Sequence, residues 1–462
     1  MHSCLHLRLA IHLALAASLA AQGQFVPTGP FGPSALSPTG DHALGTDAVG
    51  PYRWSPAAGR EYLGGDSTFI AAAATPDAAL ICGRLPDPQL GSFAPGLWSE
   101  ASGQWTAFGG LIPDPSCASG QFTDLSHDGA VLAGLVSDGC GVTAPAGYTA
   151  AAGLVLLPDV GGLGGAVHAV SADGAWLAGY AALGPFLGNS AALWSAQGSL
   201  SRPLQSPGNP DGIGELYSLD ADGDAYCGID ATGQGFVFRN GQLLSLADEL
   251  PAQWPLGRVW ELDDRGDVAV GRYTPLVGTD RALVWTSWGG GLDAETLFAH
   301  FGFVPDPAAP LRDLLAVSGD GLTFLASSGT GFSPIRTWVR LPASWQDLGG
   351  AGPAGPELRG LGYLHPGAPA GLALEGAAPQ ATGWVAAALQ SAPLPLLGGV
   401  LHASPLDLLL PLQTDSQGRW EAPFAWPAGA PAGTQLTLQV ATLDAAGPGG
   451  LALSNAVQAT GW

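Results

Sequence analysis

The sequence predicts an all-β fold, a seven-bladed β-propeller-like repeat domain followed by a small β-sandwich. The first observation behind this prediction is a nine-residue block, clearest at residues 171–179, which recurs seven times with a period of about 45 residues. The second is an aromatic residue that follows every block, Trp194 in this copy. The third is composition: glycine makes up 70 of 462 residues and 47% are apolar, which suits a turn-rich β protein with a large core.

Each block opens with a tight turn. Its first position is always Ser, Thr or Asp, and Asp-Gly follows in most copies, which supplies the positive φ of a hairpin. The apolar run after the turn, such as residues 175–178, indicates a strand covered on both faces. The run at residues 192–195 and the turn at Gln197-Gly198 predict a second hairpin, so each repeat supplies four strands.

A four-stranded unit of this kind cannot bury its own faces, so neighbouring units have to stack. A ring of such sheets limits exposed edges, and the aromatic residue of each repeat would fill the wedge between adjacent blades. We expect residues near Phe25 and Val26 to pair with the last blade and close the circle.

The chain begins with a predicted secretory signal peptide, residues 1–21. His2, His6 and Arg8 precede an apolar run at residues 9–19, and small residues follow for cleavage. The run is too short to span a membrane, and no later stretch is long enough either. The expected location is therefore secreted, extracellular or at the cell surface, with no membrane span.

The charge of the chain excludes one class of partner. Its 38 carboxylates and 15 basic residues, all arginine, give a formal net charge of −23. Nucleic-acid binding needs a basic face, so we expect none. The expected partner is an unidentified extracellular ligand, glycan or protein, and the protein is expected to be a monomer.

The four cysteines that follow the predicted signal peptide divide into two pairs. Cys82 and Cys227 occupy the same repeat position and are interpreted as buried apolar residues. Cys117 and Cys140 flank the third block in polar, glycine-rich loops, and an oxidising compartment would favour a disulfide between them.

The blocks resemble the extracellular HAF repeats of bacterial secreted proteins, which carry a Ser-x-Asp-Gly turn, a glycine-terminated strand and an Ala-x-x-Trp segment. Residues 126–134 and 171–179 match most closely, the latter with 161–165 and 191–194. The resemblance covers about residues 30 to 342 and weakens where Thr39, Asp220 and Arg265 depart from the pattern. It implies a propeller-like fold in residues 22–342 and secretion, and it implies no reaction.

The repeat pattern stops after Trp338, and residues 343–356 are predicted as a Gly/Pro-rich junction. Short apolar runs separated by turns over residues 357–462 suggest a β-sandwich. This segment resembles a C-terminal domain appended to many bacterial secreted proteins, on the strength of motifs that include 345–349, 356–362, Trp426-Pro427 and 453–456. The resemblance implies an accessory module for display, sorting or attachment.

No residue cluster in the sequence requires a particular chemistry, so no catalytic residue, cofactor or metal is assigned. The run Asp220-Ala221-Asp222-Gly223-Asp224 has the oxygen-rich look of a calcium loop, but it lacks the later bidentate glutamate and fits an ordinary turn. The histidines are scattered, and His127 and His168 fall at different places in the repeat, so symmetry would not bring them together.

Three functions remain open: a non-enzymatic binding or interaction scaffold, which we favour; a secreted polysaccharide hydrolase or lyase with carboxylates near the propeller axis; and a passive structural protein of the envelope. The longest insertions between the block and the aromatic residue, 84–97, 135–147, 180–193 and 272–284, should project from one end of the ring. Candidate residues for a ligand face there are Arg84, Phe93, Phe186, Arg272 and Tyr273.

Overall fold

The computed structural model describes residues 23–29, 32–87, 92–109, 119–137, 143–159, 164–184, 188–196, 198–205, 209–329, 334–353, 355–396 and 398–462. Their internal contacts divide the chain into two compact units. One consists of Gly23–Ala299 and Phe303–Leu341, and the other chiefly of Pro342–Trp462.

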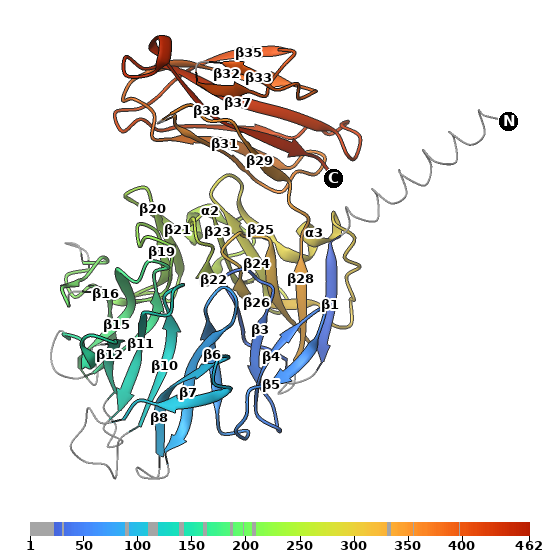
Figure 1. Cartoon of the computed structure of the whole chain (residues 1–462). Coiled ribbons are helices and arrows are strands. Elements are labelled where there is room, and N and C mark those ends of the chain that lie inside the picture. The colour runs from blue at the N-terminus through green and yellow to red at the C-terminus, as the bar shows by residue number, and fades with distance from the viewer. Residues whose placement is uncertain are drawn as a thin grey trace. The chain divides into compact units, whose positions relative to one another are not determined.

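The first unit is a β-propeller, as predicted (Figure 1), and within the described ranges it contains seven antiparallel four-stranded sheets. Three sheets come first in the chain: β2 (Ala35–Leu36), β3 (Ala43–Thr46), β4 (Pro51–Ser55) and β5 (Gly59–Tyr62); β6 (Ile70–Ala74), β7 (Leu80–Asp87), β8 (Ser92–Ser99) and β9 (Gln104–Ala107); β10 (Ser119–Leu125), β11 (Val131–Ser137), β12 (Thr143–Thr149) and β13 (Gly153–Leu156). Three more follow: β14 (Gly165–Val170), β15 (Trp176–Gly184), β16 (Gly188–Ser195) and β17 (Leu200–Ser201); β18 (Gly214–Leu219), β19 (Tyr226–Asp230), β20 (Gly235–Arg239) and β21 (Gln242–Ser245); β22 (Leu256–Leu262), β23 (Val268–Thr274), β24 (Arg281–Thr286) and β25 (Gly290–Asp293). The last sheet combines β26 (Leu311–Val317), β27 (Thr323–Ser328) and β28 (Ile335–Arg340) with the first strand of the chain, β1 (Gln24–Gly29).

The predicted turn blocks connect the first and second strands of these sheets. In the third copy the Ser126 hydroxyl donates to Asp128 Oδ1 at 2.7 Å, and the same carboxylate accepts from the Ala130 N–H at 2.9 Å. Gly129 supplies the expected positive φ of 68°. The hydroxyl also accepts from the Val131 N–H, at 3.0 Å, so the block fixes the start of the second strand.

The ring is closed by β1. In this pairing Phe25 lies opposite Val339 and Val26 opposite Trp338, so the first strand of the chain completes the last sheet as the sequence predicts. The indole N–H of Trp338 donates to the Gly40 carbonyl at 3.0 Å, which adds a link from the last sheet to the first turn block.

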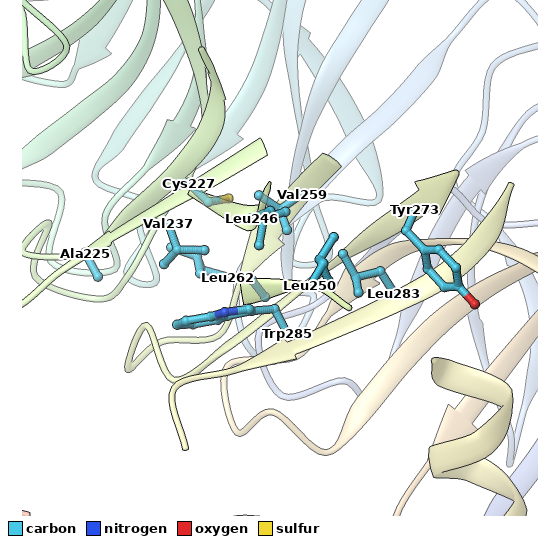
Figure 2. Close-up of a cluster of buried hydrophobic side chains, with 11 residues drawn as sticks. Ala225, Cys227, Val237, Leu246, Leu250, Val259, Leu262, Tyr273, Leu283 and Trp285 are labelled. Carbon is cyan, nitrogen blue, oxygen red and sulfur yellow. The ribbon is translucent and has the colours of Figure 1, made fainter. Parts of the chain in front are cut away.

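The propeller core lies between neighbouring sheets. Figure 2 shows one such cluster, in which Cys227 and Val237 from one sheet pack with Val259, Leu283 and Trp285 from the next. Trp285 is 1% exposed, which confirms that this repeat aromatic is buried between sheets. Two short helices, α2 (Leu246–Glu249) and α3 (Ala294–Ala299), follow the outer strands of the fifth and sixth repeats.

The second unit is also built of strands. Five form one sheet, in the order β29 (Trp345–Gly349), β38 (Leu451–Thr460), β37 (Gln435–Leu443), β32 (Thr382–Ala388) and β35 (Leu408–Gln413). Three form another, in the order β30 (Glu357–Leu361), β31 (Pro369–Glu375) and β36 (Trp420–Ala425), and two form a small hairpin, β33 (Leu394–Leu396) and β34 (Gly399–Leu401). A short 3-10 turn, η1 (Pro448–Gly450), precedes β38.

The two larger sheets of this unit share one core. Leu358 and Leu374 from the three-stranded sheet pack in the same cluster as Val385, Val440 and Val457 from the five-stranded sheet. The predicted junction at 343–356 contains β29, which pairs with β38, so that part of the segment belongs to the second unit. None of the helices in the described ranges is long and apolar enough to cross a membrane.

Candidate ligand site on the propeller axis

The candidate site is a cavity bordered by the first strands of the propeller sheets. Six of these strands contain a β-bulge at the same position, immediately after the residue that pairs with the closing residue of the block, which is glycine in five strands and Ala326 in the last. The bulge leaves one residue per strand out of the pairing register: Ala72, Thr123, His168, Tyr217, Trp260 and Leu315.

The cavity has a volume of about 210 Å³. Five of the six bulge residues line it, which places residues from five different repeats around one space. Because a bulge re-aims a side chain out of the sheet, the repeat itself builds the cavity wall.

Three rings form an arc along this wall, which we call the aromatic arc: His168, Tyr217 and Trp260. Neighbouring ring centroids are 5.5 Å apart between His168 and Tyr217 and 5.4 Å apart between Tyr217 and Trp260. The polar atoms of the two larger rings are already engaged, because the Tyr217 hydroxyl donates to Glu215 Oε2 at 3.0 Å and the Trp260 N–H donates to Asp313 Oδ1 at 2.9 Å.

Two carboxyl groups, Asp124 and Glu261, line the same cavity. Protein atoms surround both, yet each keeps some accessible surface because the cavity has room for water. Burial raises the pKa of Asp124 to about 7. Burial, and then the charge of Asp124, raise the pKa of Glu261 well above its ordinary value.

Each of these carboxyls also bonds to the next repeat. Asp124 Oδ2 accepts from the Val170 N–H at 2.7 Å, and Glu261 accepts from the Val317 N–H. Ser218, at the equivalent position, accepts from the Leu262 N–H at 3.1 Å. These bonds hold neighbouring first strands together around the axis.

One end of the cavity is bordered by the turn blocks. There His127 Nε2 lies 3.6 Å from Asp264 Oδ1, and their side chains are 31% and 40% exposed, so the cavity meets solvent at this end. Burial raises the pKa of the Asp264 carboxyl, and His127 partly opposes that effect. Backbone bonds join consecutive turns here, as from the Asp264 N–H to the Gly319 carbonyl at 3.1 Å.

His127 and His168 both line this cavity, although they occupy different positions in the repeat and are not related by its symmetry. The reason is that a turn residue and a bulge residue of different sheets both point toward the axis. The sequence does carry a signal for the arc, since His168, Tyr217 and Trp260 all stand three residues before a block, in three consecutive repeats.

The predicted ligand-face residues that the structure describes lie toward the opposite end, where the second and third strands of each sheet meet. The Arg84 guanidinium lies over the Phe93 ring at 4.4 Å. Arg272 lies over the Trp260 ring at 5.6 Å, so it is the predicted residue that reaches the aromatic arc. Tyr273 is 4% exposed because it stacks on Trp254 and donates to Asp293, which removes it from an exposed face.

Other predictions fall outside this site. Phe186, Cys117 and Cys140 lie outside the described residues. Cys82 and Cys227 are free thiols with no exposed surface. Among the residues that the structure describes, no group of three or more His, Cys, Asp or Glu side chains is placed to hold a metal ion, and this includes the turn at Asp220.

No protein-family model matches the chain, and no curated protein matches it by sequence. Solved structures similar to it include a prolyl endopeptidase, at 13% identity and a TM-score of 0.43, covering 79% of this chain and 57% of the endopeptidase. TolB from Acinetobacter baumannii is 13% identical with a TM-score of 0.34, covering 65% of this chain and 78% of TolB. The β-propeller domain of the Trilobed protease from Pyrococcus furiosus is 8% identical with a TM-score of 0.42, covering 68% of this chain and 95% of that domain. Similarities this distant say nothing about activity.

Proposed function

We propose that this protein is a secreted or cell-surface propeller of the HAF-repeat kind that acts as a non-enzymatic binding scaffold and holds a small extracellular ligand in its axial cavity. The observation that carries the proposal is the convergence of bulge side chains from five repeats on one cavity, with an aromatic arc on one side and carboxyls among the lining residues. The wall combines aromatic rings with many polar groups, and convergent polar groups of this kind fix the orientation of a small molecule in its site. The second unit would serve as the accessory module for display, sorting or attachment.

The second candidate is the secreted polysaccharide hydrolase or lyase. It is favoured by one observation, that Asp124 and Glu261 face one cavity with raised pKa values, as an acid pair would. The bonds of both carboxyls to the next repeat point instead to a structural role, since Ser218 makes the same bond with no carboxyl. The cavity, at about 210 Å³, is also smaller than the range of about 300–1,000 Å³ usual for sites that enclose larger ligands.

The test is to fill the cavity. Ala72 lines it, and Ala72→Trp would place an indole in the space opposite the aromatic arc. A library of small amines, sugars and amino acids is screened by thermal shift against the wild-type protein and this variant. We expect at least one compound to raise the Tm of the wild-type protein and to leave the Tm of Ala72→Trp unchanged.

The matched control is Leu243→Trp, which adds an indole on the outer strand β21, where Leu243 is 53% exposed. This control should respond to compounds as the wild-type protein does. An equal response from all three proteins would refute an axial site. Turnover of a polysaccharide that disappears in Glu261→Gln would support the hydrolase instead.

A further inference from the structure

We propose that the axial cavity selects a small organic ammonium ion over neutral molecules of the same shape. This inference rests on the proposed function, because it names the chemical class of the ligand for that cavity. The argument uses the charge balance of the wall, the orientation of the rings and the size of the space.

The wall carries acidic groups without fixed counter-charges. Asp124 and Glu261 have no ion-pair partner among the residues with described positions, and the cavity lining contains no arginine. Two further carboxyls, Asp220 and Asp264, line the cavity, and of these Asp264 lies near positive groups, with His127 Nε2 3.6 Å from its Oδ1 and the charge of Arg265 also acting on it. Burying a carboxylate without a counter-charge is unfavourable, so a bound cation would supply the charge that the wall lacks.

The aromatic arc favours the same class of ligand. Since the Trp260 N–H and the Tyr217 hydroxyl are engaged elsewhere, the arc offers ring surface and few free hydrogen-bonding atoms. A sugar needs several directional donors and acceptors, whereas an alkylated ammonium group is attracted by ring faces alone. The Trp260 ring already attracts a cation, because the Arg272 guanidinium lies 5.6 Å from its centroid.

The size of the cavity restricts the ligand further. A volume of about 210 Å³ accommodates a compact ion and excludes an oligosaccharide. The cavity meets solvent beside His127 and Asp264, so the acidic rim at the turn end would attract a cation toward the opening.

A pH dependence follows from the groups that face these carboxyls. The charges of Asp124 and Glu261 repel each other across the cavity. The Cys82 thiol lies close enough to Asp124, and the Cys227 thiol to Glu261, to feel the carboxylate charge. The other titratable residues that line the cavity are His127, His168, Tyr217, Asp220 and Asp264. A cation favours the ionised carboxyls, so its binding should release protons and strengthen as the pH rises from about 5.5 to 8.

The experiment compares choline with 3,3-dimethylbutan-1-ol, its neutral isostere, by isothermal titration calorimetry at both pH values on the full secreted protein. We expect choline to bind at least about tenfold more tightly than the isostere, and more tightly at pH 8 than at pH 5.5. Glu261→Gln and Asp124→Asn should each weaken choline binding severalfold, while an amide oxygen preserves the bond to the next strand. Asp306→Asn, an exposed carboxyl outside the cavity lining, is the matched control and should bind choline as the wild-type protein does.

Equal affinity for choline and its isostere would overturn the ammonium inference, as would no choline binding to the folded wild-type protein. Binding that is indifferent to both Glu261→Gln and Asp124→Asn would overturn it as well. The proposed function is tested separately. It holds if a neutral compound raises the Tm of the wild-type protein but not that of Ala72→Trp.

Discussion

Asp124 and Glu261 stand two residues before their turn blocks, where other repeats carry Ala73, Ala169 and Ser218. A carboxyl at this position does two things at once, because it accepts a backbone hydrogen bond from the next repeat and faces the cavity. The first task needs only an acceptor, as Ser218 demonstrates. The hydrogen bond between repeats therefore does not require the negative charge of a carboxyl group.

Asp124 should make the protein less stable as the pH rises toward neutrality. An aspartate titrates near pH 3.9 in an unfolded chain, whereas burial raises the pKa of Asp124 to about 7 in the folded protein. Between those values the folded state holds a proton that the unfolded state releases, so the free energy of unfolding falls with rising pH. Asp124→Asn should remove this loss and exceed the wild-type stability at pH 8 by on the order of 2 kcal/mol, while nearly matching it at pH 4. Calorimetric Tm values from pH 4 to 8 would measure the difference.

Asp128→Asn is the control for this experiment. The Ser126 hydroxyl and the Ala130 N–H lower the pKa of Asp128, so its contribution is lost only as the pH falls below its ordinary range. The wild-type slope between pH 4 and 7 should therefore persist in this variant. If Asp124→Asn also kept that slope, the assignment of the raised pKa would be wrong.

At the residue scale the sequence could predict the turns but not the site. Ser126 and Asp128 are local partners, so a repeated pattern reveals them. Asp124 and Glu261 are separated by three repeats, and nothing local in the sequence shows that they face one cavity. Whether a loop aromatic is exposed also depends on packing that the sequence does not show, since Trp254 covers Tyr273.

At the scale of the strand, the closing glycine of the second to sixth blocks has a structural cause that the sequence pattern did not reveal. A Cβ on Gly179 would lie 2.0 Å from the carbonyl oxygen of Ala166, and the equivalent distance at Gly134 to Gln121 is 2.1 Å. These glycines pair with the strand just before its bulge. The glycine and the bulge therefore depend on each other, and the bulge in turn aims a side chain at the axis. Ala326 replaces the glycine in the last repeat, where the register shifts twice.

Gly179→Ala should consequently be strongly destabilising. The added methyl group would overlap backbone atoms, which cannot rotate away as a side chain can, and the expected cost is about 3 kcal/mol or more. Gly147→Ala is the matched variant in strand β12, since a Cβ there would meet its nearest neighbour at 3.7 Å, an ordinary contact. Urea unfolding of both variants would test this. Similar midpoints for the two would show that the bulge does not impose the glycine.

At the scale of the whole molecule, the repeat period and the apolar patterning predicted the propeller, and the pairing of β1 with β28 agrees with the expected closure. The repeats make the overall fold predictable from the sequence, because the same hairpin pattern occurs in all seven blocks. The strand runs of the second unit were also predictable, since residues 372–374, 436–440 and 451–453 fall in β31, β37 and β38. The junction was harder to predict from the sequence, because β29 pairs with β38 although Gly and Pro residues follow it.

The thiol content of the protein is the prediction that belongs to this scale. Cys82 and Cys227 are free and buried, and the Cys117–Cys140 disulfide remains a prediction from the sequence. Protein prepared in an oxidising compartment without the predicted signal peptide, and unfolded in denaturant without reductant, should therefore react with two equivalents of a thiol reagent, and the native protein with almost none. Four reactive thiols in denaturant would rule out the disulfide.

The most direct test of the axial site is a crystal structure of the propeller with the compound that raises its Tm most. The account predicts ligand density on the axis, in contact with Tyr217 and Trp260 and within hydrogen-bonding or ionic reach of Asp124 or Glu261. Density confined to the outer loops, with the axial cavity holding only water, would contradict it.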